Sequence, residues 1–240
     1  MEACTQVVFL ARQRGVHVGW FKGKMHSSAA LYEHDRKLLD EVGALVLVGI
    51  DEAGRGPLAG PVVVAGAVLP LDDEELPVYD SKSLTEAERE ALFERLTTSP
   101  RIRYAIAERS AERIDEINIL RATHEGMREV AVALGASFAL VDGLSVPKFP
   151  VSARFIVKGD ATSASIAAAS IIAKVHRDHL MVEYDAKYPE YGFARHKGYC
   201  TKEHLGALKR LGPCPIHRRS FGPVANIISP QMTFDFCYEV

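Results

Sequence analysis

GIDEAGRGPLAGPV, residues Gly49 to Val62, places two adjacent acidic residues, Asp51 and Glu52, at the exit of the apolar run 44–50. A short run this rich in β-branched residues is typical of a buried strand. Acids at the end of a buried strand cost desolvation energy unless a cation compensates them. The following Gly54-Arg55-Gly56 lets a backbone approach a ligand closely, because glycine has no side chain. The segment therefore indicates a metal site beside a phosphate-bearing substrate, or else a strand-to-turn junction with solvated acids.

Further sequence blocks follow this segment along the chain. They are DSKSL (80–84), VDG (141–143), KGD (158–160), AAASIIAKVHRD (167–178) and HKGYCT (196–201). Together with the first segment they resemble type 2 ribonuclease H, the bacterial ribonuclease HII family, from about Tyr32 to Val224. The resemblance implies an α/β protein with the ribonuclease H-like fold: a mixed five-stranded sheet flanked by helices, with a small helical C-terminal region.

Local patterns favour the same architecture. Besides the run at 44–50, strands are expected at 62–69, 102–108, 138–141 and 155–157. Thr85-Glu86-Ala87-Glu88 matches a capping box, which predicts a helix to about residue 96. Asn118 can cap a helix over 119–134, a long helix is expected from near Ser163, and helical turns are expected around 201–211. Strands followed by alternating strands and helices favour a mixed sheet with helices on its faces.

Four carboxylates fall at the ends of three of these strands. Asp51 and Glu52 follow the first, Asp142 ends the strand at 138–141, and Asp160 follows the strand at 155–157. If these three strands run parallel, all four carboxylates emerge at the same sheet edge. Oxygen ligands without His or Cys suit Mg²⁺ or Mn²⁺, and two such cations can clamp a phosphodiester during in-line attack. These four residues are the candidate catalytic and metal-binding groups.

The resemblance also implies an activity. It implies an endoribonuclease that hydrolyses the RNA strand of RNA–DNA hybrids and cuts 5′ of single ribonucleotides in duplex DNA, leaving a 3′-hydroxyl and a 5′-phosphate. It further implies that the backbone of Gly54, Arg55 and Gly56 contacts the 2′-hydroxyl and the adjacent phosphate, and that Tyr199 packs on the following sugar. Lys82 and Lys158 are expected phosphate contacts.

Two other functions remain open: a non-catalytic nucleic-acid-binding module, and a DNA-junction nuclease of the same fold. The four acids argue against the first, and Gly54-Arg55-Gly56 together with Tyr199 argues against the second. A kinase or nucleoside triphosphatase is disfavoured, because the sequence contains no GxxxxGK[ST] loop.

Charge is distributed unevenly along the chain. The 240 residues carry a net charge of −2, so total charge identifies no partner. Between Lys187 and Arg219, however, eight basic residues accompany only two acidic ones. A basic surface there would suit a nucleic acid, and a solvated helical face is the plainer interpretation. We expect His196, His217 and Arg177 to be structural or surface residues.

The remaining features bound the setting of the protein. Four scattered cysteines, the lack of a signal-peptide pattern and the lack of a membrane-length apolar run favour a cytoplasmic protein without a membrane partner, which we expect to be a monomer. Residues 29–224 form the expected catalytic domain. Residues 1–28 are treated as an extension, although Met25 is an alternative start.

The tail at 225–240 has a pattern of its own. Gln231 is followed by Met232, Phe234 and Phe236, which alternate with polar residues and give one apolar face in an extended conformation. Exposed aromatic residues near a chain end suggest a binding peptide. The pattern is similar to the short peptides that bacterial replication proteins insert into the sliding clamp, with Met and Phe where leucines are usual. The alternative is that the phenylalanines cover the protein's own surface.

Overall fold

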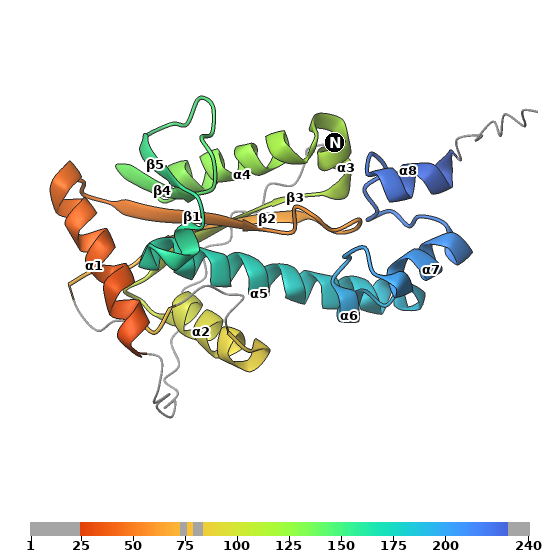
Figure 1. Cartoon of the computed structure of the whole chain (residues 1–240), viewed down its shortest axis with the longest axis horizontal. Coiled ribbons are helices and arrows are strands. Elements are labelled where there is room, and N and C mark those ends of the chain that lie inside the picture. Colours follow the sequence, from red (N-terminus) through yellow and green to blue (C-terminus); the bar gives the residue numbers. More distant parts are fainter. Residues whose placement is uncertain (1–24, 73–75, 79–83, 230–240) are drawn as a thin grey trace, which may run out of the picture.

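A five-stranded mixed sheet lies at the centre of the structure (Figure 1), a computed structural model that describes residues 25–72, 76–78 and 84–229. The strand order is β3-β2-β1-β4-β5. The strands are β1 (Leu47–Ala53), β2 (Val62–Val68), β3 (Arg103–Arg109), β4 (Phe138–Asp142) and β5 (Ser152–Ile156). β2 is antiparallel to both β1 and β3, whereas β1, β4 and β5 run parallel. The predicted fold class is confirmed, including the parallel arrangement on which the four-acid site depends.

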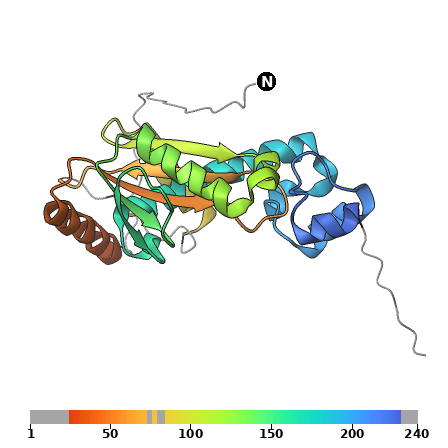
Figure 2. The same cartoon turned by 90° about the horizontal axis from the view of Figure 1, so that it is seen from above.

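Helices cover both faces of this sheet, and the C-terminal helices gather beyond one end of it (Figures 1 and 2). The α-helices are α1 (Met25–Val42), α2 (Glu86–Thr98), α3 (Ala111–Ile117), α4 (Ile119–Ala133), α5 (Ala164–Lys187), α6 (Phe193–His196), α7 (Lys202–Leu211) and α8 (Gly222–Ile228). Two short 3₁₀ helices are η2 (Gly159–Ala161) and η3 (Pro189–Tyr191). One core lies between the sheet and α5, α2 and α1, and a second lies between the sheet and α4. Among the described residues, no helix has the length and apolar character that a membrane crossing requires.

Close packing of α5 on β1 depends on small residues. A Cβ atom added to Gly49 would lie 2.0 Å from the carbonyl carbon of Ser165, so only glycine fits at this position. The facing side of α5 is rich in buried alanines, including Ala168 and Ala169. The first turn of α5, where Ser163 caps the helix, is thereby fixed directly over the strand that carries Asp51.

Helix α1 begins inside the segment that we treated as an extension, and the sequence patterns did not predict it. Its Asp35 is fully buried, and one carboxylate oxygen accepts hydrogen bonds from Ser163 Oγ at 3.0 Å and from the Ser165 backbone N–H at 2.8 Å. A carboxylate at this position also interacts favourably with the positive end of the α5 dipole. Helix α1 therefore supports the start of α5 as an integral part of the fold.

Several element boundaries differ from the sequence expectations. β5 ends at Ile156, so the expected strand at 155–157 begins three residues earlier, at Ser152. Asp51 and Glu52 do not follow β1 but lie within it, because β1 remains paired with β2 as far as Ala53. Helix α3 was also missed, although Ser110 caps it through the Arg113 backbone N–H. The capping box that starts α2 and the Asn118 cap of α4 are confirmed, and α5 begins directly after Ser163, as expected.

Candidate active site

The candidate site lies where β1 extends past its parallel neighbour. The pairing of β1 with β4 ends at Ile50, opposite Val141, while β1 continues to Ala53 beside β2 alone. Asp51 and Glu52 lie in this overhang, and Asp142 is the last residue of β4. The parallel arrangement thus brings the carboxylates of two strands to one edge, as the sequence predicted.

Two neighbouring carboxylates lie close enough to Asp51 for their charges to act on it. Burial raises the pKa of Asp51 well above its usual range, and the negative charges of Glu52 and Asp142 raise it further. Burial also raises the pKa of Glu52, although Arg55 opposes this shift through an ion pair with an N–O distance of 3.3 Å. A hydrogen bond from Ser170 on α5 partly offsets the shift of Asp51. The site therefore holds more negative charge than its protein neighbours compensate.

Asp142 and Asp160 are linked through one turn of backbone. The Gly159 N–H donates to Asp142 Oδ1 at 2.6 Å, and Gly159 begins the η2 turn that contains the buried Asp160. Asp160 thus reaches the same edge from a 3₁₀ turn rather than from the end of a strand. Within the described parts of the chain, no three His, Cys, Asp or Glu side chains are arranged as a ready metal cage. The chemistry of the donor set nevertheless fits a hard divalent cation, because it consists of carboxylates with an unmet demand for positive charge.

The Gly54-Arg55-Gly56 loop lies next to these acids, and two buried arginines bind backbone carbonyls in this loop and in the segments packed against it. Arg218 donates to the backbone carbonyls of Gly60 at 3.0 Å, Arg55 at 2.9 Å and Gly54 at 2.6 Å. Arg177 donates in the same way to Pro61, Lys197 and Ala59, at 3.0 to 3.1 Å. No carboxylate pairs with either guanidinium among the described residues. Arg218 thus binds the carbonyls of Gly54 and Arg55 from the inner side, while Arg55 and Gly56 remain exposed.

Tyr199 stands beside this loop. A Cβ atom added to Gly56 would lie 3.9 Å from Tyr199 Cε1, and the guanidinium carbon of Arg177 lies 5.9 Å from the centre of the Tyr199 ring. The ring is 45% exposed, so it offers a free face next to the loop. The structure therefore brings the Gly54-Arg55-Gly56 loop and Tyr199 together, although Gly56 and Tyr199 are 143 residues apart in the sequence. The resemblance assigned both to substrate recognition.

The other predicted contacts have different outcomes. Lys158 is exposed and follows β5 with a positive φ of 59°, close to Gly159 and hence to the acids. Lys82, and the tail residues Gln231, Met232, Phe234 and Phe236, lie outside the described residues. Arg218 was counted toward a basic surface, but it is fully buried, because its guanidinium binds the loop carbonyls. That expectation was wrong for this residue.

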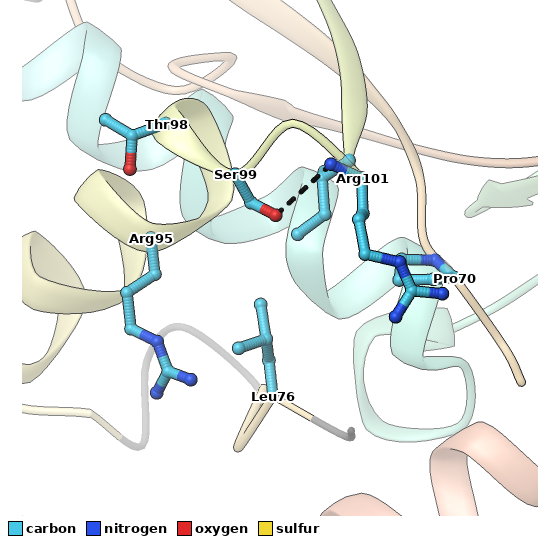
Figure 3. A pocket seen from close by; sticks show the side chains of 7 residues that line it. Pro70, Leu76, Arg95, Thr98, Ser99 and Arg101 are labelled. Carbon is cyan, nitrogen blue, oxygen red and sulfur yellow. Dashed lines mark hydrogen bonds between the residues drawn. The ribbon is translucent and has the colours of Figure 1, made fainter. Parts of the chain in front are cut away.

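A cavity of about 250 Å³ lies at the opposite end of the sheet from the candidate site. Figure 3 shows the side chains that line it. Its lining includes Pro70, Leu76, Arg95, Ser99 and Arg101. Pro70 follows β2 at the end where β2 passes the start of β1, so the cavity is separated from Asp51 by the length of the strand. Arg101 Nη2 lies 3.0 Å from Asp72 Oδ1, and this ion pair offsets part of the positive charge of the cavity lining. The cavity plays no part in the candidate site.

Comparison with known proteins agrees with this geometry. Residues 48–224 match the family described as Ribonuclease HII. The chain belongs to the ribonuclease HII family. A relative named Ribonuclease HII, from Desulfitobacterium hafniense strain Y51, is 53% identical over 184 residues, which cover 76% of this chain and 70% of the relative. Its family makes this protein a nuclease of the ribonuclease H type, which acts on RNA paired with DNA.

Solved structures show the same fold. The ribonuclease H2 of Pyrococcus horikoshii OT3 superposes with a TM-score of 0.63 at 29% identity, covering 76% of this chain and 97% of that one. The ribonuclease HII of Archaeoglobus fulgidus, solved as a complex with PCNA, gives a TM-score of 0.60 at 31% identity, covering 69% of this chain and 88% of that one. The ribonuclease HII match at 48–224 runs from the second residue of β1 through α7 and includes all four candidate acids.

Proposed function

We propose that this ribonuclease HII hydrolyses the RNA strand of RNA–DNA hybrids and also cuts on the 5′ side of single ribonucleotides in duplex DNA, leaving a 3′-hydroxyl and a 5′-phosphate. The observation that supports this most strongly is the negative charge of Asp51, Glu52 and Asp142 beside the Gly54-Arg55-Gly56 loop, which Arg55 compensates only in part. Such a site requires cations for its own stability and presents them next to a loop suited to a phosphate.

Asp51, Glu52, Asp142 and Asp160 are the residues that we assign to holding Mg²⁺ or Mn²⁺, since ribonucleases H in general depend on divalent metals. The chemistry that two such cations supply when bound is activation of the attacking water and stabilisation of the leaving oxygen. The protein fixes the positions of these carboxylates through hydrogen bonds. The Gly159 N–H donates to Asp142, and the Glu52 N–H donates to Asp51 at 2.7 Å. The ion pair with Arg55 restrains Glu52 in the same way.

Substrate selection is assigned to the loop and to Tyr199. The exposed backbone of Arg55 and Gly56 is accessible to the 2′-hydroxyl, the group that distinguishes RNA from DNA. The free face of Tyr199 is suited to packing on the deoxyribose that follows the ribonucleotide. Lys158, and Lys82 by its sequence block, are assigned to phosphate contacts.

The decisive experiment compares three duplexes incubated with the full chain and Mg²⁺ or Mn²⁺. One carries a single ribonucleotide, one is a uniform RNA–DNA hybrid, and one is an all-DNA junction. We expect cleavage of the first two and none of the third, with mapped 3′-hydroxyl and 5′-phosphate ends. Cleavage of the junction alone would favour the DNA nuclease, and binding of all three without cleavage would favour the non-catalytic module.

The proposal also includes a partner. The enzyme is monomeric and cytoplasmic, and its tail from Gln231 to Phe236 binds the replication sliding clamp. Two observations support it, namely the alternation of Met232, Phe234 and Phe236 after Gln231, and the solved complex of the A. fulgidus ribonuclease HII with PCNA. Docking on the clamp would bring the enzyme to newly made DNA. Titration of purified clamp against the full chain and a chain lacking residues 231–240 tests it. Equal affinities, or none for the full chain, would contradict it.

A further inference from the structure

A series of buried hydrogen bonds lies behind Tyr199, formed by three histidines and a cysteine of the C-terminal region. His204 and His217 are fully buried, and His196 and Cys214 nearly so. They come from α6, α7 and the segment between α7 and α8. Neither their spacing in the sequence nor the functional site described above accounts for their convergence.

The geometry fixes which nitrogen of each ring carries the proton. His204 Nδ1 lies 2.9 Å from the Tyr199 carbonyl oxygen, which can only accept, so Nδ1 donates and Nε2 is bare. That bare Nε2 lies 3.0 Å from His217 Nε2, which must therefore donate. His217 Nδ1 is then bare and accepts from the Cys214 backbone N–H at 3.0 Å, with the thiol at 3.1 Å. In each hydrogen bond of the series the donor lies on the Cys214 side and the acceptor on the Tyr199 side, and the reverse assignment would leave the Tyr199 carbonyl without a donor from His204.

His196 supports the same segment from a second side. Its Nε2 donates to the Tyr191 carbonyl at 2.8 Å, and its Nδ1 accepts from the Gly198 N–H at 3.2 Å. Its ring stacks on that of His204, with the ring centres 4.5 Å apart. The backbone directly before Tyr199 is thus fixed by one histidine and the Tyr199 carbonyl by another.

Tyr199 needs such support, because it lies outside regular structure. It falls between the end of α6 at His196 and the start of α7 at Lys202, next to Lys197 and Gly198 with positive φ angles of 50° and 82°. An exposed ring on an irregular segment has no helix or strand to set its direction. Its orientation therefore depends on the contacts of its own backbone and on the Arg177 guanidinium beside its ring.

We propose that His204 and His217 are positioning residues that hold Tyr199 toward the RNA–DNA junction, with His204 acting on the Tyr199 carbonyl and His217 fixing the tautomer of His204. The inference rests on the substrate role proposed above for Tyr199. Both histidines act through Tyr199 and neither touches the substrate. Burial lowers the pKa of both rings, that of His217 to about 4, so both remain neutral under assay conditions near pH 8.

A matched pair of variants separates positioning from simple packing. His204→Asn places an amide N–H where Nδ1 lies and retains the donor to Tyr199, whereas His204→Gln places its amide where Nε2 lies and loses that donor. Both remove the ring stacked on His196. We expect His204→Gln to raise KM for the single-ribonucleotide duplex about fivefold relative to the uniform hybrid, the loss of a neutral hydrogen bond of ~1 kcal/mol. His204→Asn should stay close to wild type.

Tyr199→Ala is the reference for these variants. If it shifts the ratio of the two KM values and His204→Gln and His204→Asn behave alike, the positioning role is overturned while the role of Tyr199 stands. If Tyr199→Ala leaves the ratio unchanged, its substrate role fails and the inference fails with it, although cleavage of both substrates would still support the nuclease function.

A second measurement does not depend on activity. In ¹⁵N-histidine NMR of the wild-type chain near pH 8, we expect His204 protonated on Nδ1 and His217 protonated on Nε2. The ¹⁵N shifts distinguish the two tautomers, and His204→Asn assigns the resonances. An Nε2-protonated His204 would overturn the inference, because that ring could not donate to the Tyr199 carbonyl.

Discussion

Arg218→Met tests whether a buried arginine without a carboxylate partner holds the Gly54-Arg55-Gly56 loop. The side chain makes three hydrogen bonds to backbone carbonyls, of which those to Gly54 and Gly60 are buried. Methionine fills similar volume without a donor, so it leaves these carbonyls without a partner. Arg219→Met is the matched control, because it removes the same formal charge one residue away and Arg219 is exposed.

The magnitude follows from the contacts. A buried carbonyl left unpaired costs ~1–3 kcal/mol, so two of them cost ~2–6 kcal/mol. Removing a guanidinium whose pKa burial lowers to about 9 recovers part of this cost. We therefore expect Arg218→Met to lower the free energy of unfolding by about 3 kcal/mol, or Tm by about 6–12 °C for a chain of this size.

The assay is thermal unfolding of both variants, followed by cleavage kinetics below their melting temperatures. We expect Arg219→Met to melt within about 2 °C of wild type, since exposed substitutions change stability little. Arg218→Met should also raise KM for the single-ribonucleotide duplex, because the loop to which we assign recognition of the 2′-hydroxyl loses its support. Equal melting temperatures for the two variants would refute the reasoning.

Three further predictions concern the acids, the packing and the pH dependence. Asp51→Asn or Asp142→Asn should abolish cleavage but leave duplex binding, measured by fluorescence anisotropy, because carboxylates repel the phosphate backbone. Gly49→Ala should lower Tm severely, since its Cβ meets the backbone of Ser165, whereas Gly206→Ala, with open space around its Cβ, should raise it slightly. Burial and the neighbouring His204 and His196 lower the pKa of His217 from 6.5 to about 4, so the unfolded chain binds a proton that the folded chain does not. The free energy of unfolding should therefore fall by up to ~3 kcal/mol as the pH is lowered from about 6.5 to 4. In urea titrations, His217→Gln should reduce this dependence of the unfolding free energy on pH.

The features that the sequence predicts well are the local ones. Thr85 and Glu88 form both hydrogen bonds of the capping box within four residues, so the pattern alone identifies the start of α2. The positions of Asp51 and Asp142 also follow from local information, namely short apolar runs with acids at their ends. Their convergence at one edge of the sheet then follows if the strands run parallel, an arrangement that the order of strands and helices favours.

The features that the sequence does not predict depend on distant partners. Arg218 and Arg219 are adjacent residues of the same type, and only the carbonyls of a loop about 160 residues earlier bury one of them. Asp35 lies in a polar helical segment, and its partners Ser163 and Ser165 are some 130 residues away. Arg177 and His196 at least fall in blocks that resemble the family, whereas Arg218, His204 and His217 lie outside those blocks.

Charge of both signs is buried on either side of the Gly54-Arg55-Gly56 loop, and neither is compensated by the other. Arg177 and Arg218 bind carbonyls rather than carboxylates, while Asp51 shares its surroundings with further acids rather than with a base. The arginines are separated from the acids by the loop itself, so direct pairing does not occur. A phosphodiester at the loop would lie between buried positive charge behind the backbone and carboxylates that require cations in front of it. If the proposed function holds, binding of substrate and cations would offset the cost of burying these charges, in addition to the stability that Arg218 gains from its hydrogen bonds to the loop.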